Sequence, residues 1–460
     1  MTLQWWGMTE NRMGGRALVV TVLAFIVLGI GWLFWARGRA MGRPTPAVVL
    51  LPFAAASPES ESFSDGLTIE LINALAKVEK LKVVSWNRAA PFRGKGGRLR
   101  ELRDQLQAGS VVDGTVRKQG DRLQISVKLI DTNTGESIWS DTLDRPEREV
   151  FDIQERIAKG IVYALNVPMR IDPQRILVPP RTSSMPAYED YLQARAWLGR
   201  FSRESLARSS EYAAKAIAAD PKYGPAYALL AANYGLFEYP THESIAKAKD
   251  LAGKAIQMNA SSGEAHAALG MALGIGDWDW PGARLELERA VQWSPGSADA
   301  HAALALGYLL PTNDPDGAEY EVRKALELDP KSFYANYAAA EVLLSRNKLA
   351  DSLERFRAAL EICGDFPGVR RDYATALKAV GQADLAAEEL AKAGPAARGP
   401  LEDARRAAGS ADLDAAFTAL DKAIDQHDVG LALIQSDMRL ANLRKDARYR
   451  PVLQRLKLRE

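Results

Sequence analysis

This 460-residue sequence has one cysteine, four histidines and a net charge of only +1. Its single cysteine, Cys363, excludes an intrachain disulfide, although cysteine usage alone does not decide the cellular compartment. The 59 Lys and Arg residues nearly balance the 58 Asp and Glu residues, and no long basic run occurs, so the electrostatic footprint of a nucleic-acid-binding protein is absent. A content of 47% hydrophobic and 25% charged residues is that of a globular protein. We therefore expect folded domains and no nucleic-acid partner.

No grouping of side chains predicts a metal site or a catalytic centre. Two of the four histidines, His266 and His301, stand 35 residues apart. A metal pair is one interpretation of this spacing, but no carboxylate or thiol ladder accompanies the two histidines, and packing explains them better. Cys363 has no neighbouring histidine and no nucleophile elbow. We predict no metal, no cofactor and no enzymatic activity.

Two polar motifs near the start of the chain have ordinary structural interpretations. The turn 93–97, Arg-Gly-Lys-Gly-Gly, could hold a phosphate on its backbone amides, but it lacks the spacing and the Ser or Thr of a phosphate-binding loop, which favours a solvated loop. Asp65 and Glu70 fit the start of a helix, because carboxylates are stabilised near its positive amino end.

Twenty uncharged residues, 17–36, lie between Arg16 and Arg37. A helix of this length crosses the roughly 30 Å hydrocarbon core of a membrane. A cleaved signal peptide is the alternative, but the apolar stretch is longer than a usual signal core, and arginines follow it where small residues are needed. We predict a short tail, 1–16, and a transmembrane helix, 17–36. The arginines on its two sides are nearly balanced, so charge alone does not set its orientation.

The segment 47–166 alternates strand-like and helical patterns. The predicted strands are 47–53, 81–86, 111–116, 123–130 and 137–140, and the predicted helices are 62–78, 99–107 and 148–165. Apolar and polar residues alternate over 123–130, which indicates a sheet with one buried face. We expect an α+β domain with a mixed sheet, followed by a proline-bearing linker, 167–186.

A ladder of alanines runs through the rest of the chain at intervals of 39, 35, 35, 34 and 34 residues. Its members are Ala216, Ala255, Ala290, Ala325, Ala359 and Ala393. A second ladder of small residues precedes it in each unit: Ala231, Gly270, Ala305, Ala340 and Ala374. A period near 34 with two helical runs per unit resembles the tetratricopeptide repeat, in which small residues let paired helices approach closely. This resemblance predicts an all-α solenoid over 187–394, with a degenerate repeat and a helical cap over 395–460.

The segment 47–166 also resembles a known family. The resemblance rests on the runs Val49–Phe53, Phe63–Leu67 with Glu70–Leu71, Phe92–Lys95 and Gly114–Arg117, and it continues through Leu129–Asp131, Thr134–Gly135, Ile138–Trp139 and Asp144–Arg145. These runs are similar to the amino-terminal domain of TolB, which is also likened to the flagellar protein FlgO. In many bacterial proteins that domain precedes tetratricopeptide repeats outside the cytoplasmic membrane, behind a cytoplasmic DNA-binding or cyclase module. Only sixteen residues precede the predicted span here, so we expect this chain to lack the usual effector.

The concave groove of the repeats is the best candidate for a functional surface, because the first helix of each unit lines it. By register, its lining comprises Glu264, Met271, Asp299, Leu306, Tyr334, Tyr337, Glu341, Arg371 and Lys378. The cluster of basic residues that clamps a peptide carboxylate is not seen. We predict partner binding at Tyr334, Tyr337, Glu341, Arg371 and Lys378, with the two tyrosines as anchors. The alternative, that these tyrosines pack only within the array, stays open.

Together these patterns predict a non-enzymatic scaffold or sensor module that binds a protein or peptide partner through its repeat groove. The predicted location is the bacterial inner membrane, crossed once, with the bulk of the chain in the periplasm. The alternative is the exported sensory half of a signalling or transcriptional system whose effector is a separate protein. The sequence indicates neither the partner nor the oligomeric state.

Overall fold

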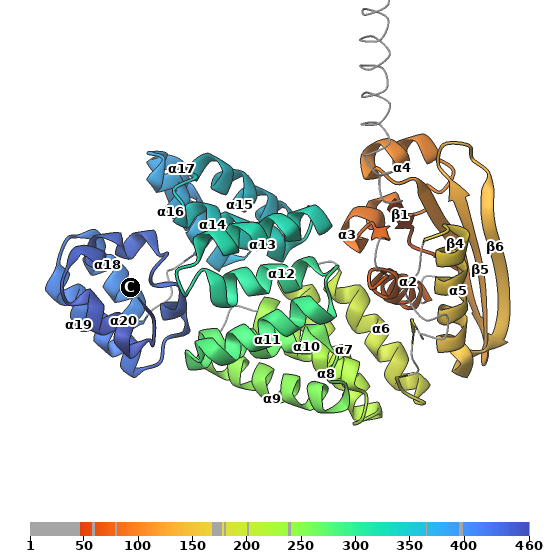
Figure 1. The fold of residues 1–460 in the computed structure, drawn as a ribbon, viewed down its shortest axis with the longest axis horizontal. Helices are drawn as coiled ribbons and strands as arrows, with labels where there is room; N and C mark the ends of the chain where they lie inside the picture. The colour runs from red at the N-terminus through yellow and green to blue at the C-terminus, as the bar shows by residue number, and fades with distance from the viewer. Residues whose placement is uncertain are drawn as a thin grey trace, which may run out of the picture. The chain divides into compact units, whose positions relative to one another are not determined.

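The computed structural model describes residues 47–57, 60–78, 81–167, 177–178, 181–199, 202–237, 241–364, 366–394 and 399–459. Residues 47–460 form one compact unit (Figure 1). The predicted tail, 1–16, and the predicted transmembrane helix, 17–36, lie outside the described residues. Within the part of the chain that is described, no helix combines the length and the apolar character needed to cross a membrane.

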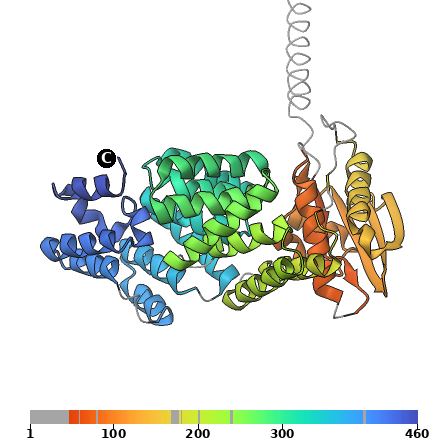
Figure 2. The ribbon, with the colours of Figure 1, turned by 90° about the horizontal axis from the view of Figure 1, so that it is seen from below.

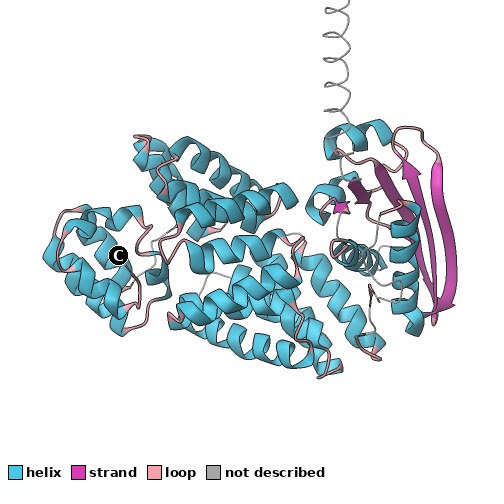
Figure 3. Cartoon of the chain, viewed as in Figure 1, coloured by secondary structure: helices cyan, strands magenta, loops and turns pink. Residues whose placement is uncertain are grey.

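The first part of this unit is a mixed sheet covered by helices on both faces (Figure 3). Its strands are β1 (Ala47–Leu50), β2 (Ala54–Ala55), β3 (Lys82–Val83), β4 (Ser110–Gln119), β5 (Arg122–Asp131) and β6 (Ser137–Pro146). They run in the order β3-β1-β4-β5-β6, with β2 also paired to β4. The pairs that involve β1, β2 and β3 are parallel, whereas β4, β5 and β6 form an antiparallel meander. This is the mixed sheet that the sequence predicts.

The helices of this part follow from apolar residues at helical spacing. They are α2 (Glu61–Leu75), α3 (Trp86–Ala89), η2 (Ala90–Phe92), α4 (Leu99–Leu106), η3 (Glu147–Glu149) and α5 (Val150–Ala164). The helices α2 and α5 share one core with the face of β5 that carries Leu123, Ile125, Val127 and Leu129. The segment 86–106 packs on the opposite face against Val49, Leu51 and Val111. The alternation in β5 therefore separates buried from outward side chains, as period-2 patterning requires.

Three predicted boundaries in this region differ from the structure. The predicted strand 47–53 ends at Leu50 as β1, and β2 begins only at Ala54, because Pro52 between them lacks the amide proton that a ladder needs. The predicted strand 81–86 shortens to β3, because Ser85 and Trp86 begin α3. The third strand of the meander extends to Pro146, well past the predicted 137–140.

The rest of the unit consists of antiparallel helix pairs (Figures 1 and 2). The pairs are α6 (Met185–Leu198) with α7 (Arg203–Ala219), α8 (Gly224–Ala232) with α9 (His242–Met258), α10 (Gly263–Met271) with α11 (Trp280–Trp293), α12 (Ala298–Leu304) with α13 (Pro315–Leu328), α14 (Phe333–Ser345) with α15 (Leu349–Cys363), α16 (Pro367–Ala379) with α17 (Ala383–Lys392), and α18 (Pro400–Gly409) with α19 (Leu413–Asp425). The first helix begins at Met185, inside the predicted linker 167–186. Ser184 accepts a hydrogen bond from the Ala187 amide there and fixes the helix start.

Small residues set the spacing of these helices. Every alanine of the 216–393 ladder is buried. The first helices of three units end in a π-helical turn: η4 (Asn233–Phe237), η5 (Ala272–Gly276) and η6 (Ala305–Leu309). A Cβ added to Gly274 in η5 would lie 2.4 Å from the Gly307 carbonyl oxygen in η6. Glycine is therefore needed where two of these turns meet backbone to backbone.

The chain ends in a helical segment that folds back on the repeats. Its elements are η7 (Val429–Leu433), η8 (Met438–Lys445) and α20 (Tyr449–Arg455). It packs on the insert that precedes α11, where Trp280 Nε1 donates a hydrogen bond to the Leu456 carbonyl at 2.8 Å and Trp278 stacks on His427. The two tryptophans that lengthen this repeat therefore form the docking site of the C-terminal segment.

Candidate functional site

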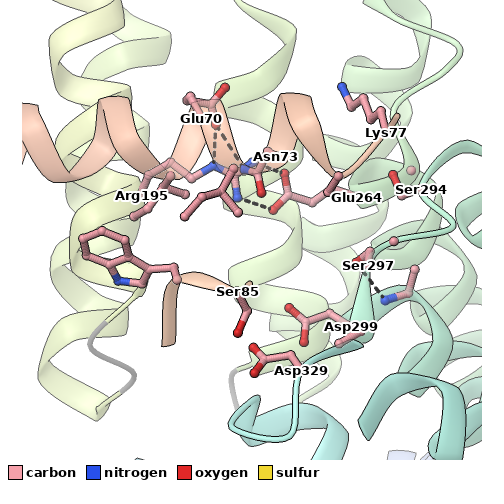
Figure 4. Close-up of a pocket in the computed structure, with 18 of the residues that line it drawn as sticks. Glu70, Asn73, Lys77, Ser85, Arg195, Glu264, Ser294, Ser297, Asp299 and Asp329 are labelled. Atoms are coloured by element: carbon pink, nitrogen blue, oxygen red, sulfur yellow. Dashed lines mark hydrogen bonds and ion pairs between the residues drawn. The ribbon is translucent and has the colours of Figure 1, made fainter. Parts of the chain in front are cut away.

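A buried ion-pair network joins the sheet-bearing part to the repeats. Arg195 on α6 donates two parallel hydrogen bonds to the Glu264 carboxylate on α10, at 2.9 and 2.8 Å. Its Nε donates to the Tyr191 hydroxyl at 2.9 Å, and that hydroxyl donates to Glu70 of α2 at 3.1 Å. Arg181 contacts the other oxygen of Glu70 at 3.0 Å. Figure 4 shows the Arg195 side chain between Glu70 and Glu264.

Glu70 is therefore a central member of a network and not a helix-initiating acid. It lies in the second half of α2, and only 7% of its side chain is exposed. Burial raises the pKa of Glu70, but Arg181 and Arg195 outweigh it and hold that pKa below its usual value. The interpretation of Glu70 as a residue of the helix start is wrong, because its partners come from segments more than a hundred residues away.

A cavity of about 410 Å³ lies beside this network, between the segment 69–87 and the repeats. Its charged lining is balanced, with Glu70, Glu264, Asp299, Asp329, Lys77, Lys82, Arg181 and Arg195. Figure 4 shows Asp299 and Asp329 near Ser85, on the other side of the cavity from Glu70. Asn87 Nδ2 donates to Asp329 Oδ2 at 3.1 Å, which ties α3 to the repeats as well.

Asp299 in this cavity holds its proton to an unusually high pH. Burial is the main cause, and the carboxylates of Asp329 and Glu264 add to it, whereas the Ser332 hydroxyl and Arg195 oppose it. Together they raise the pKa of Asp299 to about 6. The folded protein therefore binds more protons here than the unfolded chain does between about pH 4 and pH 6.

We expect wild-type stability to fall as pH rises through this interval, because ionising Asp299 costs more in the folded state than in the unfolded one. In the wild type, the Ser332 hydroxyl donates to Asp299 Oδ1 at 2.9 Å. Asp299→Asn removes the ionisation and keeps an oxygen that can accept this hydrogen bond. The unfolding free energy of the variant relative to wild type should rise by about 1–3 kcal/mol between pH 4 and pH 7. Chemical denaturation at several pH values measures this, with the exposed Glu361→Gln as a control. A flat difference for Asp299→Asn contradicts the assignment.

A second cavity, of about 310 Å³, lies farther along the groove, and we call it the C-terminal cavity. Its walls come from α14 and α16 and from the returning segment 428–439. Apolar and aromatic residues form much of the lining: Met271, Leu306, Phe333, Tyr334, Tyr337, Phe366, Val369, Leu433 and Met438. Phe333 and Tyr334 line both cavities, so this part of α14 adjoins each of them.

Carboxyl groups meet arginines at the polar end of the C-terminal cavity. Asp437 accepts from Arg405 Nε at 2.7 Å and from Arg439 Nε at 2.9 Å. Burial opposes ionisation of Asp437, but the two guanidiniums prevail and lower its pKa to about 2. Burial, reinforced by the neighbouring Asp372, raises the pKa of Glu341 well above its usual range. The Oε1 atom of Glu341 is buried and has no hydrogen-bond partner among the described residues.

The structure brings nearly all of the predicted groove residues to these two cavities. Glu264 and Asp299 line the first, Met271, Leu306, Tyr337, Glu341 and Arg371 line the second, and Tyr334 lines both. Lys378 lines neither cavity and is exposed on α16. The predicted set of Tyr334, Tyr337, Glu341 and Arg371 is thus gathered at one place, without Lys378.

The two tyrosines pack within the array and also border the cavity. Tyr334 is only 3% exposed, and its hydroxyl lies 3.6 Å from the Met271 sulfur. The Tyr337 ring stacks on Phe333, and its hydroxyl donates to Asp372 at 3.1 Å. Both hydroxyls therefore have partners within the array.

The motifs set aside in the sequence have partners within the fold. His266 contacts Glu286 through Nδ1 at 2.5 Å and the Ala260 carbonyl through Nε2 at 2.9 Å, and His301 repeats this arrangement with Glu321 and Pro295. Because both ring nitrogens are engaged, these histidines join the helices of a repeat. The described residues hold no group of three or more His, Cys, Asp or Glu side chains arranged for a metal ion.

The sequence does not indicate that three arginines lie at these cavities. Arg405 and Arg439 reach the C-terminal cavity because the end of the chain folds back, and only the tertiary fold places them there. Arg195 was also missed. Its long side chain lies on the first helix of the array at the place where α2 docks, which only the tertiary fold reveals.

No protein-family model matches the sequence. Among curated proteins the chain is similar to "Putative adenylate cyclase 3" of Rhizobium meliloti (strain 1021), with 27% identity over 188 residues. These residues are 40% of this chain and 32% of the relative, so the chain spans about a third of the length of the curated relative it matches.

Solved structures with a similar arrangement include a thermophilic TPR protein of Thermus thermophilus, with 19% identity and a TM-score of 0.34, covering 42% of this chain and 99% of that one. A human IFIT1 dimer with m7Gppp-AAAA matches with 16% identity and a TM-score of 0.39, covering 67% of this chain and 72% of that one. The helix pairs and their buried small-residue ladder define the architecture: from α6 onward the described residues form an array of antiparallel helix pairs similar to tetratricopeptide repeats, preceded by a mixed sheet.

Proposed function

We propose that this chain is a non-enzymatic, membrane-anchored interaction module that binds a protein partner through the C-terminal cavity of its repeat groove. The observation that carries this proposal is the Glu341 carboxyl, whose buried Oε1 has no hydrogen-bond partner among the described residues, beside a wall of aromatic and apolar side chains. Buried polar atoms are nearly always satisfied, and an unsatisfied one at a cavity points to a missing ligand.

The covered groove restricts how a partner can bind. The segment 69–87 faces one end of the concave surface, and the segment 428–439 faces the other. A partner helix or strand laid along the whole groove would displace both. We therefore propose that the partner inserts one or two side chains into the C-terminal cavity, with Tyr337 and Arg371 at the contact.

Paired charge reversals on one helix test the proposal. Arg371 and Lys378 both lie on α16, but only Arg371 lines the cavity. Full-length chain carrying Arg371→Glu should recover at least tenfold less partner from detergent-solubilised membranes of the native host, because truncating or reversing a true anchor costs about 2 kcal/mol or more. Lys378→Glu should recover the wild-type amount.

Helical content and melting temperature of both variants must match wild type for this comparison to hold. Equal recovery by Arg371→Glu and wild type contradicts binding at the cavity. Equal loss in both variants points instead to a general charge effect on the exposed face of α16.

The location is part of the proposal. The twenty uncharged residues 17–36 support an anchor in the bacterial inner membrane, and the likeness of 47–166 to TolB amino-terminal domains supports a periplasmic bulk. Protease added to intact spheroplasts should then degrade the repeats. Protection of the repeats until the membrane is lysed contradicts this orientation.

A second candidate is the sensory half of a signalling system that acts through a separate effector. The observation in its favour is the similarity to a protein named as an adenylate cyclase, of which this chain spans about a third. Recovery of a cyclase or a transcriptional regulator with the wild-type chain would select this candidate. Cyclic-nucleotide formation by the purified chain alone would contradict the non-enzymatic assignment.

A further inference from the structure

The C-terminal cavity carries an excess of acidic groups. Five carboxyl residues line it, namely Glu341, Asp372, Glu402, Asp428 and Asp437, against three arginines, Arg371, Arg405 and Arg439. The arginines already have partners within the protein. Arg405 and Arg439 are held by Asp437, and Arg371 Nη2 donates to the Ala393 carbonyl at 3.3 Å. The group that still lacks a partner atom is the Glu341 carboxyl, and that group attracts a donor.

The geometry around Glu341 selects the kind of donor. An ammonium is a compact point charge with three donors at the end of an apolar stem, and the buried Glu341 Oε1 offers it an acceptor. The Tyr337 ring on the same helix and the nearby Phe333 ring, stacked on it at 6.0 Å, provide π-faces for a cation and apolar surface for its stem. About 310 Å³ of cavity accommodates a chain of four to six carbons.

We infer that the C-terminal cavity binds an alkylammonium group on an apolar stem, with Glu341 as its anionic acceptor and Tyr337 and Phe333 beside the stem. This deepens the proposed function by naming the chemistry of the inserted group. A lysine side chain of a protein partner and a free aliphatic amine carry the same group, and the experiment separates them.

Charge neutralisation makes the binding depend on pH. The charged and titratable groups that face Glu341 are Asp372 from α16, Arg405 from α18, Asp437 at the N-cap of η8 and Arg439 within η8. Burial favours the protonated Glu341 carboxyl, and a bound ammonium would favour the ionised one. The ligand therefore competes with a proton, and its affinity should increase from pH 5 to pH 8 while the amine itself stays charged.

Matched ligands on the full-length, detergent-solubilised chain test this inference. N-acetyl-lysine amide and its Nε-acetylated form have the same stem but differ in charge, and n-pentylamine represents the free amine. Isothermal titration at pH 7.5 should give saturable binding of the charged ligands and at least tenfold weaker binding of the acetylated one. Repeating the titration in buffers of different ionisation enthalpy should show net proton release.

Glu341→Gln should lower the affinity for the charged ligands at least tenfold. Glu327 is an exposed carboxylate on α13, and Glu327→Gln should leave that affinity unchanged. Preference for n-pentylamine over the lysine amide identifies a free amine as the ligand, and the reverse identifies a lysine side chain. Equal binding of the charged and acetylated ligands, unchanged affinity in Glu341→Gln, or no saturable binding at all overturns the inference. If any of these results is obtained but Arg371→Glu still recovers less partner than wild type, the proposed function is retained and only this inference fails.

Discussion

Replacing Arg195 by methionine should destabilise the chain by about 3–5 kcal/mol, because it leaves Glu264 without its cation and Glu70 with Arg181 alone in a largely buried network. Arg195 is 15% exposed and contacts Glu264 through two hydrogen bonds of 2.9 and 2.8 Å. Methionine keeps most of the stem volume, so the loss comes from the charge and the hydrogen bonds. The free energy of unfolding from urea denaturation, measured at pH 7, is the direct readout.

An exposed ion pair on the next helix provides the control. Arg208 contacts Glu211 at 3.1 Å, with about half of each side chain exposed. Arg208→Met should cost less than about 1 kcal/mol, since solvent screens such a pair. The double variant Arg195→Met/Glu264→Gln should be less destabilised than the sum of its single changes, because the Gln side chain removes the charge that Arg195 neutralised. Equal costs for Arg195→Met and Arg208→Met would show that the buried network contributes little to stability.

Local pattern accounts for much of the fold that the sequence predicts. The alternation over 123–130 and the 34-residue ladder of alanines both report contacts between neighbouring segments, and both correspond to buried residues in the structure. A strand or a helix pair is encoded within some forty residues, so a single sequence displays its period. The predicted domain boundaries depend on the same local patterns and stay predictions.

The candidate site was only partly predictable, because it depends on contacts between distant segments. Register along the first helices placed Tyr337, Glu341 and Arg371 on the groove, since residues four apart share a helix face and residues 34 apart occupy equivalent positions in successive repeats. The segments that cover that groove do not recur with the repeat period, so the sequence does not reveal them. Trp278 and Trp280 read as a loop insert, but they hold the C-terminal segment, and that segment brings Arg439 to the cavity.

Glu70 is a second residue whose contacts with distant segments are not visible in the sequence. An acidic residue near a predicted helix start is most simply explained by the helix dipole, which is a local effect. Its real partners, Arg181 and Tyr191, lie 111 and 121 residues farther along the chain. Only the docking of α2 on α6 brings these groups together.

Gly66 is the residue that permits that docking. It lies in α2, and a Cβ added to it would be 2.5 Å from the Leu192 carbonyl oxygen and 2.6 Å from the Leu192 Cβ of α6. Real Cβ atoms do not approach backbone so closely, and a helix backbone cannot move aside as a flexible side chain does. An alanine at this position therefore forces α2 and α6 apart and disturbs the contacts of Glu70 with Tyr191 and Arg195.

Gly66→Ala should consequently cost about 3 kcal/mol or more, at or above the upper end of typical overpacking. Alanine has the better helix propensity, so propensity alone predicts the opposite sign, a gain of about 0.5–1 kcal/mol. Gly253→Ala measures that gain, because Gly253 lies in the middle of α9 and an added Cβ meets no atom within 4 Å. Urea denaturation should thus move the two variants in opposite directions from wild type, and limited proteolysis should cleave Gly66→Ala faster near residues 177–184. A Gly66→Ala variant as stable as Gly253→Ala would mean that α2 and α6 do not pack at this distance.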